Sequence, residues 1–312
     1  MNSENPAARY PTIVGESDAI KKLYTSLDTA AGNGKPVHLV GEYGTGREVV
    51  AREIHRARKR GGEFVNRDCE SVPSRSKRFF FGSTEAYSSG ISKGLIAEAD
   101  DGTLYLKNVN RLSPDQKDPV VLWVRSGTIY PLPGGRKGVD AHLITSGPNP
   151  KTGIKEYDRE LIEVPPLRER GNDVILLAVY YMDCINSLVK HFQPKKVMEP
   201  AALGELRNHE WLGNIRELRD VVYEAYRCSC DNERITADDI KFGKIVRTPS
   251  TVTFDTTVPI KRSGDIIPFI EEERAILKHA LEVAGGKIPE AAKRLAIGRA
   301  TLYRKVKKYN LR

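Results

Sequence analysis

The sequence predicts an α/β domain built on a parallel sheet, followed by a helical region and a small all-helical domain. Short apolar runs rich in strand formers alternate with longer helical patterns, and a glycine-rich turn joins the first such run to the first such helix. Positive charge gathers in the last residues, which sets the final domain apart. At 312 residues the chain has room for about two domains and a sizeable core.

Strand and helix candidates alternate from residue 36 onward. The strand candidates are 36–40, 63–66, 103–106 and 140–145, and the first helical patterns are 47–60 and 114–125. After Pro165-Pro166 three helical patterns follow, at 172–192, 199–209 and 214–228. We expect a polar tail (1–10), an α/β subdomain (11–170), a helical lid subdomain (171–242), a linker (243–267) and a helical C-terminal domain (268–312).

The composition excludes several classes of protein. Hydrophobic residues make up 39% and charged residues 29% of the chain, as in ordinary globular proteins. No run approaches the roughly 18–20 apolar residues of a membrane span, and the first residues lack the layout of a secretory signal. Four cysteines do not form a disulfide framework, and Cys228-Ser-Cys230 lacks further ligands at metal-binding spacing. We therefore expect a cytoplasmic protein with no membrane segment and no metal site.

The net charge of +9 is unevenly distributed. Residues 287–312 contain nine lysines or arginines and one acid, so nearly all of the excess positive charge lies in 26 residues. Evenly spread charge would suggest general solubility, whereas a concentrated basic segment suggests a module for a polyanion. Nucleic acid is the leading candidate.

A glycine-rich loop follows the first strand candidate and opens the first helix. Its spacing resembles the phosphate-binding pattern G-x-x-x-x-G-K-[ST], in which backbone N–H groups and the helix N-terminus hold phosphates. Arg47 stands where the pattern has lysine, and Glu48 where it has a hydroxyl residue. The alternative is a simple turn between strand and helix. The candidate nucleotide-binding residues of the loop are Gly41, Glu42, Tyr43, Gly44, Thr45, Gly46, Arg47 and Glu48.

Five sequence blocks in one order resemble the AAA+ domain of bacterial enhancer-binding proteins, the activators of sigma-54 RNA polymerase. The blocks are GEYGTGRE at 41–48, FVNRDC at 64–69, DGTLYLKN at 101–108, PPLRER at 165–170 and WLGNIREL at 211–218. The resemblance covers about residues 13–241. It implies a P-loop parallel sheet with helices on both faces and a helical lid, in a ring that hydrolyses ATP.

Several positions depart from what the resemblance implies for catalysis. Lys107 and Asn108 replace the acidic pair that supports Mg²⁺ and the attacking water, and Asp68 replaces the asparagine that switches the catalytic acid. The sensor Thr-Asn pair falls at Gly147-Pro148, and 85–90 replaces the sigma-contacting loop. Lys155 and Arg159 are the nearest remnants of the arginine fingers of a neighbouring subunit. Arg216 matches the sensor-II arginine, which either meets a bound phosphate or pairs with a carboxylate on its helix.

The C-terminal residues resemble the Fis-type helix-turn-helix domain that ends enhancer-binding proteins. In residues 286–311, apolar positions fit two short helices that meet at a turn near Gly298. The second helix of such a motif enters the major groove of DNA with its N-terminal residues near the base edges. The alternative is a solvated lysine-rich helix. The candidate DNA-binding residues are Lys287, Arg299, Thr301, Arg304, Lys305, Lys307 and Lys308.

We interpret the chain as a sequence-specific DNA-binding transcriptional regulator with a degenerate AAA+ domain. ATP or ADP is its candidate ligand. We expect that the chain has no catalytic residues for hydrolysis, does not bind Mg²⁺ and does not remodel sigma-54 polymerase. The alternatives are an ATP-hydrolysing sigma-54 activator and a regulator that senses a nucleotide. Candidate partners are double-stranded DNA, RNA polymerase, a regulatory protein and further copies of the chain, as a dimer on DNA or a larger ring.

Overall fold

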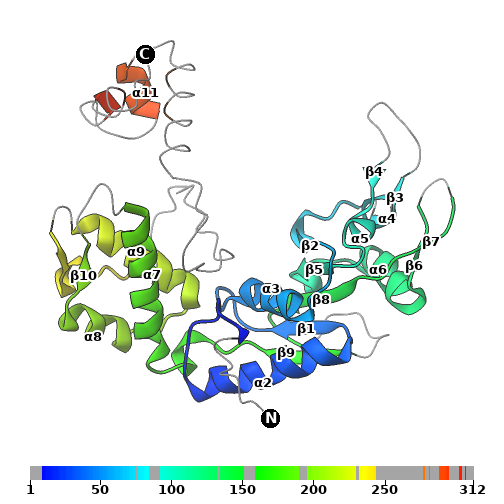
Figure 1. Cartoon of the computed structure of the whole chain (residues 1–312), viewed down its shortest axis with the longest axis horizontal. Coiled ribbons are helices and arrows are strands. Elements are labelled where there is room, and N and C mark those ends of the chain that lie inside the picture. The colour runs from blue at the N-terminus through cyan, green and yellow to red at the C-terminus, as the bar shows by residue number, and fades with distance from the viewer. Residues whose placement is uncertain are drawn as a thin grey trace. The chain divides into compact units, whose positions relative to one another are not determined.

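The computed structural model of the chain forms two compact units, Met1–Pro259 and Ile260–Arg312 (Figure 1). The residues that the structure describes are 9–74, 76–83, 92–131, 134–150, 159–189, 195–229 and 232–243, together with 277, 281, 288–294, 302, 303 and 306 in the second unit.

A five-stranded parallel sheet is the centre of the first unit, as the sequence predicts. Its strands, in spatial order, are β2 (Phe64–Asp68), β5 (Thr103–Lys107), β8 (His142–Gly147), β1 (Val37–Val40) and β9 (Glu160–Glu163). All four neighbouring pairs run parallel. The carboxyl ends of the strands therefore meet at one edge of the sheet, where ligands of open α/β sheets bind.

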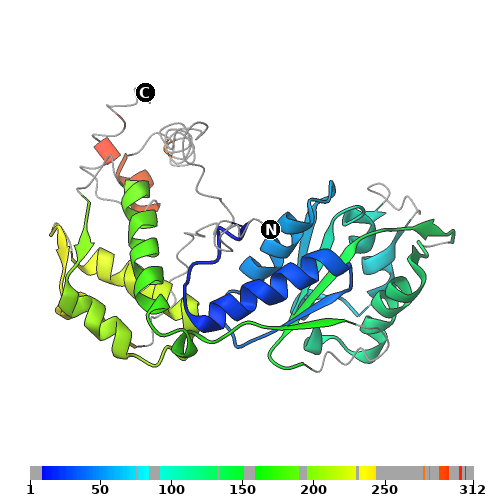
Figure 2. The same ribbon diagram turned by 60° about the horizontal axis from the view of Figure 1, so that its bottom comes forward.

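Helices and apolar side chains cover both faces of this sheet. Along β5 the buried residues alternate between the two layers: Leu104 and Leu106 join one core, and Tyr105 joins the other. The first core packs against α4 (Ser76–Phe81), α5 (Leu95–Glu98) and α6 (Pro114–Ser126). The second packs against α2 (Asp18–Asn33) and α3 (Arg47–Arg58), which lie side by side in Figure 2. This is the predicted three-layer arrangement.

A helical subdomain follows the sheet within the same unit. Its helices are α7 (Asp173–Val189), α8 (Pro200–Asn208) and α9 (Asn214–Cys228), and β10 (Val197–Met198) pairs with β11 (Arg234–Ile235). The indole of Trp211 is fully buried in this core and donates to the carbonyl of Leu206 at 2.8 Å. The three helices lie where the sequence predicts the helices of the lid.

Several elements of the sheet domain were not among the sequence-based expectations, α2 and β9 among them, and one strand is displaced. Helix α2 buries Ile20, Leu23 and Leu27 and begins at a Ser17 cap. Strand β9 is an edge strand with only Ile162 buried, so its sequence carries a weak signal. Strand β8 ends at Gly147, two residues beyond the expected end. Short antiparallel pairs join β3 (Gly82–Ser83) to β4 (Ser92–Lys93) and β6 (Thr128–Ile129) to β7 (Lys137–Gly138).

Short 3-10 turns link the larger elements: η1 (Cys69–Ser71), η2 (Val109–Arg111), η3 (Leu167–Glu169) and η4 (Ala237–Asp239). Among the described helices, none is long and apolar enough to cross a membrane.

The second unit has its own apolar cluster, described through α11 (Ile288–Arg294) and a few neighbours. The buried members are Leu277, Leu281, Ala291, Ala292, Leu302 and Val306. The spacing of these residues agrees with the predicted helical packing. The seven candidate DNA-binding residues (Lys287, Arg299, Thr301, Arg304, Lys305, Lys307 and Lys308) lie outside the described residues.

Candidate functional site

The carboxyl edge of the sheet brings together residues that are far apart in the sequence. The glycine loop follows β1, and Asp68 and Lys107 are register partners at the ends of β2 and β5. Gly41 donates its N–H to the carbonyl of Gly147, at the end of β8, at 3.2 Å. The candidate site is therefore built from the ends of four strands and the start of α3.

Glycine is required in the loop at Gly44. Its φ of +83° is a left-handed conformation, and a Cβ there would lie 2.2 Å from the carbonyl oxygen of Gly213 in the lid. The lid thus contacts the loop backbone directly, and the N–H of Arg216 donates to the carbonyl of Gly44 at 3.3 Å. Only a residue without a side chain allows this approach.

Glu42 links the glycine loop to Arg168 and to Asn214 by hydrogen bonds. Both of its carboxylate oxygens accept from Arg168, at 2.8 and 2.6 Å, and one also accepts from the amide of Asn214 at 3.1 Å. The same amide donates to the carbonyl of Tyr43 at 3.0 Å. The hydrogen bonds from Arg168, followed by that from Asn214, lower the pKa of Glu42 to about 2.

Arg47 supplies a cationic group with an unused donor. Its Nη1 is buried and has no hydrogen-bond partner within the described part of the chain, and burial lowers the pKa of the guanidinium. A buried unpartnered donor is costly unless a ligand or water satisfies it. At the first turn of α3, after a glycine loop, a phosphate oxygen is the acceptor that the setting favours. These residues fit a nucleotide phosphate.

Arg216 lies beside the loop as well. Its guanidinium stacks over the ring of Tyr43, 5.1 Å from the centroid, and Tyr43 is exposed. Arg216 therefore lies at the glycine loop through both its backbone and its side chain. The structure thus gathers the eight loop residues and Arg216 in one place.

Glu48 and Lys107 form an ion pair where the resemblance places a magnesium site. Lys107 Nζ lies 3.0 Å from Glu48 Oε2, and the two side chains are about one-third exposed (31% and 36%). The other oxygen of Glu48 accepts from Asn66 at 2.8 Å and from Arg52 at 3.2 Å. Mg²⁺ requires oxygen ligands in near-octahedral geometry, and an ammonium group repels it. The residues present do not fit Mg²⁺.

Asp68 and Asn108 form a second pair across the ends of β2 and β5. Asn108 Nδ2 lies 3.3 Å from each carboxylate oxygen of Asp68. Asp68 Oδ1 also accepts from the N–H of Glu70 at 3.0 Å, which caps the turn after β2. An amide cannot accept a proton from water, so Asn108 cannot act as a general base.

An apolar cavity of about 60 Å³ adjoins the glycine loop. Thr12, Ile13 and Val14 line it from the N-terminal segment, and Tyr181 and Ile215 line it from the lid. The cavity is small, but its walls are mostly apolar and reach Thr45 and Gly46 of the loop.

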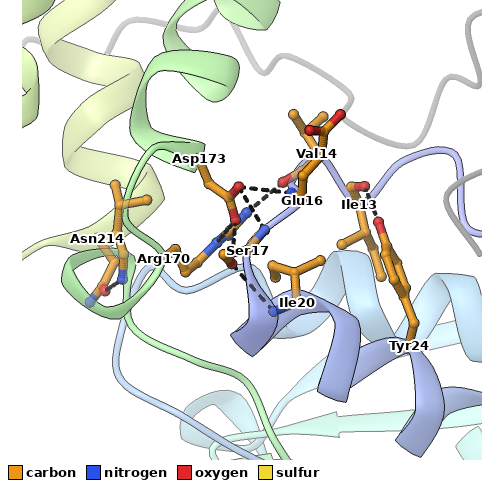
Figure 3. A network of polar contacts seen from close by, with 10 residues as sticks. Ile13, Val14, Glu16, Ser17, Ile20, Tyr24, Arg170, Asp173 and Asn214 are labelled. Atoms are coloured by element: carbon orange, nitrogen blue, oxygen red, sulfur yellow. Dashed lines mark hydrogen bonds and ion pairs between the residues drawn. The ribbon is translucent and has the colours of Figure 1, made fainter.

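A buried polar network fixes the N-terminal segment of this cavity (Figure 3). Asp173 accepts from the N–H groups of Glu16 and Ser17, at 2.8 and 3.1 Å, and from the Ser17 hydroxyl at 2.7 Å. Arg170 pairs with Asp173 at 3.2 Å and donates to the carbonyl of Val14. Arg170 and Asp173 are almost fully buried, so this network holds the start of α2 against the lid.

Sequence reasoning did not anticipate four residues that shape the site. Arg168, Asn214, Arg170 and Asp173 lie in or near the recognised blocks. Apart from the pair that Arg170 and Asp173 form with each other, the partners described above lie at least 126 residues away in the sequence. A local pattern carries no signal for contacts of this range.

The structure describes only some of the other residues that the resemblance connects with catalysis and sigma-factor contact. The segment 85–90 and Lys155 lie outside the described residues. Arg159 is described, and donates to the carbonyl of Pro150 at 3.3 Å. Within the described residues no group of three His, Cys, Asp or Glu side chains could hold a metal ion.

Comparisons with known proteins agree with this architecture. The Sigma-54 interaction domain matches residues 13–151, the AAA+ ATPase lid domain matches 168–251, and the Bacterial regulatory protein, Fis family, matches 269–309.

Two curated relatives span nearly the whole chain. The luminescence regulatory protein LuxO of Vibrio campbellii is 27% identical over 330 residues, which cover 99% of this chain and 72% of LuxO. The transcriptional regulatory protein ZraR of Escherichia coli is 29% identical over 325 residues, which cover 98% of this chain and 71% of ZraR.

A solved structure shares the fold. NtrX from Brucella abortus, in complex with ATP, has a TM-score of 0.64 at 23% identity, over 95% of this chain and 69% of NtrX. The curated relatives align with this chain across nearly its full length, through all three matched domains. The chain therefore belongs to the family of bacterial transcriptional regulators that join a sigma-54 interaction domain and an AAA+ lid to a Fis-type helix-turn-helix.

Proposed function

We propose that this regulator binds DNA through its C-terminal domain and binds ATP or ADP in its AAA+ domain without hydrolysing it. Nucleotide then acts as a ligand that stabilises the AAA+ domain or its assembly. We place this function in the cytoplasm, where DNA and nucleotide are both present.

The Asn108–Asp68 pair carries the proposal that hydrolysis is absent. Asn108 stands at the end of β5, where the resemblance calls for the acid that activates water, and its amide is not a base. Asp68 is a carboxylate, but it is engaged by Asn108 and by the N–H of Glu70. The site therefore lacks an acid in the position that the reaction needs.

Three observations support nucleotide binding. The glycine loop opens α3 as in phosphate sites, Arg47 has an unused buried donor, and an apolar cavity lies next to the loop. The structure of NtrX, with ATP bound, has the same fold.

DNA binding rests on the Fis-type match at residues 269–309 and on the basic charge of the last 26 residues. Within that domain we assign base contacts to Arg299 and phosphate contacts to Lys305, Lys307 and Lys308. Remodelling of sigma-54 polymerase is not expected, because it needs ATP turnover.

The test measures ADP binding by calorimetry and phosphate release from ATP on one sample of the full chain, with DNA present. Binding without release supports the proposal. Phosphate release that disappears in the Asp68→Ala variant would overturn the proposal and favour an ATP-driven activator. Absence of binding would remove the ligand role from the AAA+ domain.

A second measurement addresses the DNA domain. Fluorescence anisotropy of a labelled duplex at about 50 and 200 mM KCl should show an affinity that falls steeply with salt. Lys307→Ala should reduce the salt dependence, whereas Lys21→Ala, on the exposed side of α2, should leave it unchanged. An affinity that does not change with salt would contradict the assignment.

A further inference from the structure

We infer that the Lys107 ammonium replaces the divalent cation of the site, so that this chain binds nucleotide without Mg²⁺. This inference rests on the proposed nucleotide binding and specifies the form of the ligand: the free nucleotide rather than its magnesium complex.

The first step is the exchange of charge at two positions. A magnesium site of this type uses a hydroxyl at the start of the helix and an acid at the end of the strand. Here Glu48 and Lys107 stand at these positions, with Nζ and Oε2 3.0 Å apart. The positive charge thus belongs to the protein itself, at the end of β5.

The second step concerns what remains available to a ligand. An ammonium has three N–H donors, and Glu48 is the one acceptor for Lys107 among the described hydrogen bonds. The remaining donors are available to phosphate oxygens or water. Glu48, in contrast, is engaged at both oxygens, by Lys107, Asn66 and Arg52.

The third step is the charge balance of the site. The pair Glu48–Lys107 is neutral, and Arg47 adds a cation with an unused buried donor. Arg216 adds a second cation beside the loop. A magnesium ion would add two further positive charges next to Lys107 and would find Glu48 already paired. Free nucleotide, whose phosphates carry the full negative charge, is the better match.

The experiment measures the dissociation constant of ADP for the full chain in EDTA and in excess MgCl₂. We expect tighter apparent binding in EDTA, because excess Mg²⁺ converts ADP into the complex that this site disfavours. Binding that is equal or tighter in MgCl₂ would overturn this inference and leave the proposed nucleotide binding intact. Absence of binding in both buffers would overturn both.

Two variants sharpen the test. Lys107→Ala should weaken ADP binding in EDTA by about tenfold or more, and MgCl₂ should recover part of the loss because Glu48 becomes an available oxygen ligand. The double variant Glu48→Thr, Lys107→Asp should bind ADP about tenfold or more tightly with MgCl₂ than with EDTA.

A matched control replaces a different lysine, outside the candidate site, by alanine. Lys21→Ala removes an exposed ion pair with Asp18, 3.1 Å long, on helix α2. It should bind ADP like the unmodified chain in both buffers, with the same preference for EDTA. If Lys107→Ala matched this control in both buffers, Lys107 would have no role in binding and the inference would be wrong.

Discussion

Arg168 holds both carboxylate oxygens of Glu42, at 2.8 and 2.6 Å, and so ties the segment before the lid to the glycine loop. Because the partners are 126 residues apart in sequence, the contact closes a long loop of the chain. Asn214, at the start of α9, adds a third hydrogen bond to the same carboxylate. The loop conformation therefore depends on the position of the lid.

Glu42→Gln should remove a pH-dependent part of the stability. The folded pKa of Glu42 is about 2, below its ordinary value of 4.5, so the carboxylate stabilises the fold above pH 4.5. That contribution is lost as the pH falls from about 4.5 to about 2. The side chain is 43% exposed, and with solvent screening we expect about 1 kcal/mol at neutral pH.

Urea unfolding of both forms between about pH 2 and neutral pH measures this difference. Glu70→Gln removes an exposed pair with Arg111 and is the control, with an expected change below about 0.5 kcal/mol. A Glu42→Gln difference that is constant across this pH range would contradict the role of the charge.

Arg47→Ala should weaken ADP binding by about tenfold or more, roughly 1.4 kcal/mol, because a buried charged donor for phosphate is lost. Calorimetry on the full chain measures it. Arg207→Ala, on the exposed side of α8, should bind ADP like the unmodified chain. Equal binding by both variants would show that Arg47 does not face the ligand.

Gly44→Ala should destabilise the first unit by about 2 kcal/mol or more, because the new Cβ would meet the carbonyl of Gly213 at 2.2 Å in a left-handed conformation. Gly171→Ala is the matched control: its φ is +50°, and nothing lies within 4 Å of its Cβ. We expect about 1 kcal/mol there. If urea unfolding showed the same loss of unfolding free energy in both variants, the close contact between Gly213 and Gly44 would not be formed.

Asn108→Asp should lower stability by about 1 kcal/mol, because it would place a second carboxylate beside Asp68. Aspartate tolerates the left-handed backbone of this position, φ +56°, about as well as asparagine does. The double variant Asp68→Asn, Asn108→Asp should recover that loss, since the amide–carboxylate pair is restored with its partners exchanged. A double-mutant cycle in urea measures the coupling. Additive effects of the two changes would show that the pair is not formed.

The strands and lid helices could be predicted because their patterns are local. The apolar run before Gly41 and the periodic residues of α9 each carry a signal within a few residues. Strand β9 could not be predicted from its own sequence, because an edge strand with one buried residue, Ile162, looks like a loop.

The candidate site was predicted in its residue types but not in its pairings. Glu48 and Lys107 are separate departures in the sequence, 59 residues apart, and only the parallel sheet places them 3.0 Å from each other. The same holds for Asp68 and Asn108, which meet because β2 and β5 are neighbours. Pairings of this kind depend on strand order, which local patterns do not contain.

The network around Asp173 makes the sheet domain and the lid a single cooperative unit. Asp173 and Arg170 are almost fully buried charges whose partners come from residues 14–17 at the start of α2. Separating the lid from the sheet domain would break the hydrogen bonds of Asp173 to Glu16 and Ser17 and that of Arg170 to Val14 together. Partial unfolding of either part is therefore suppressed, and the two should melt in one transition.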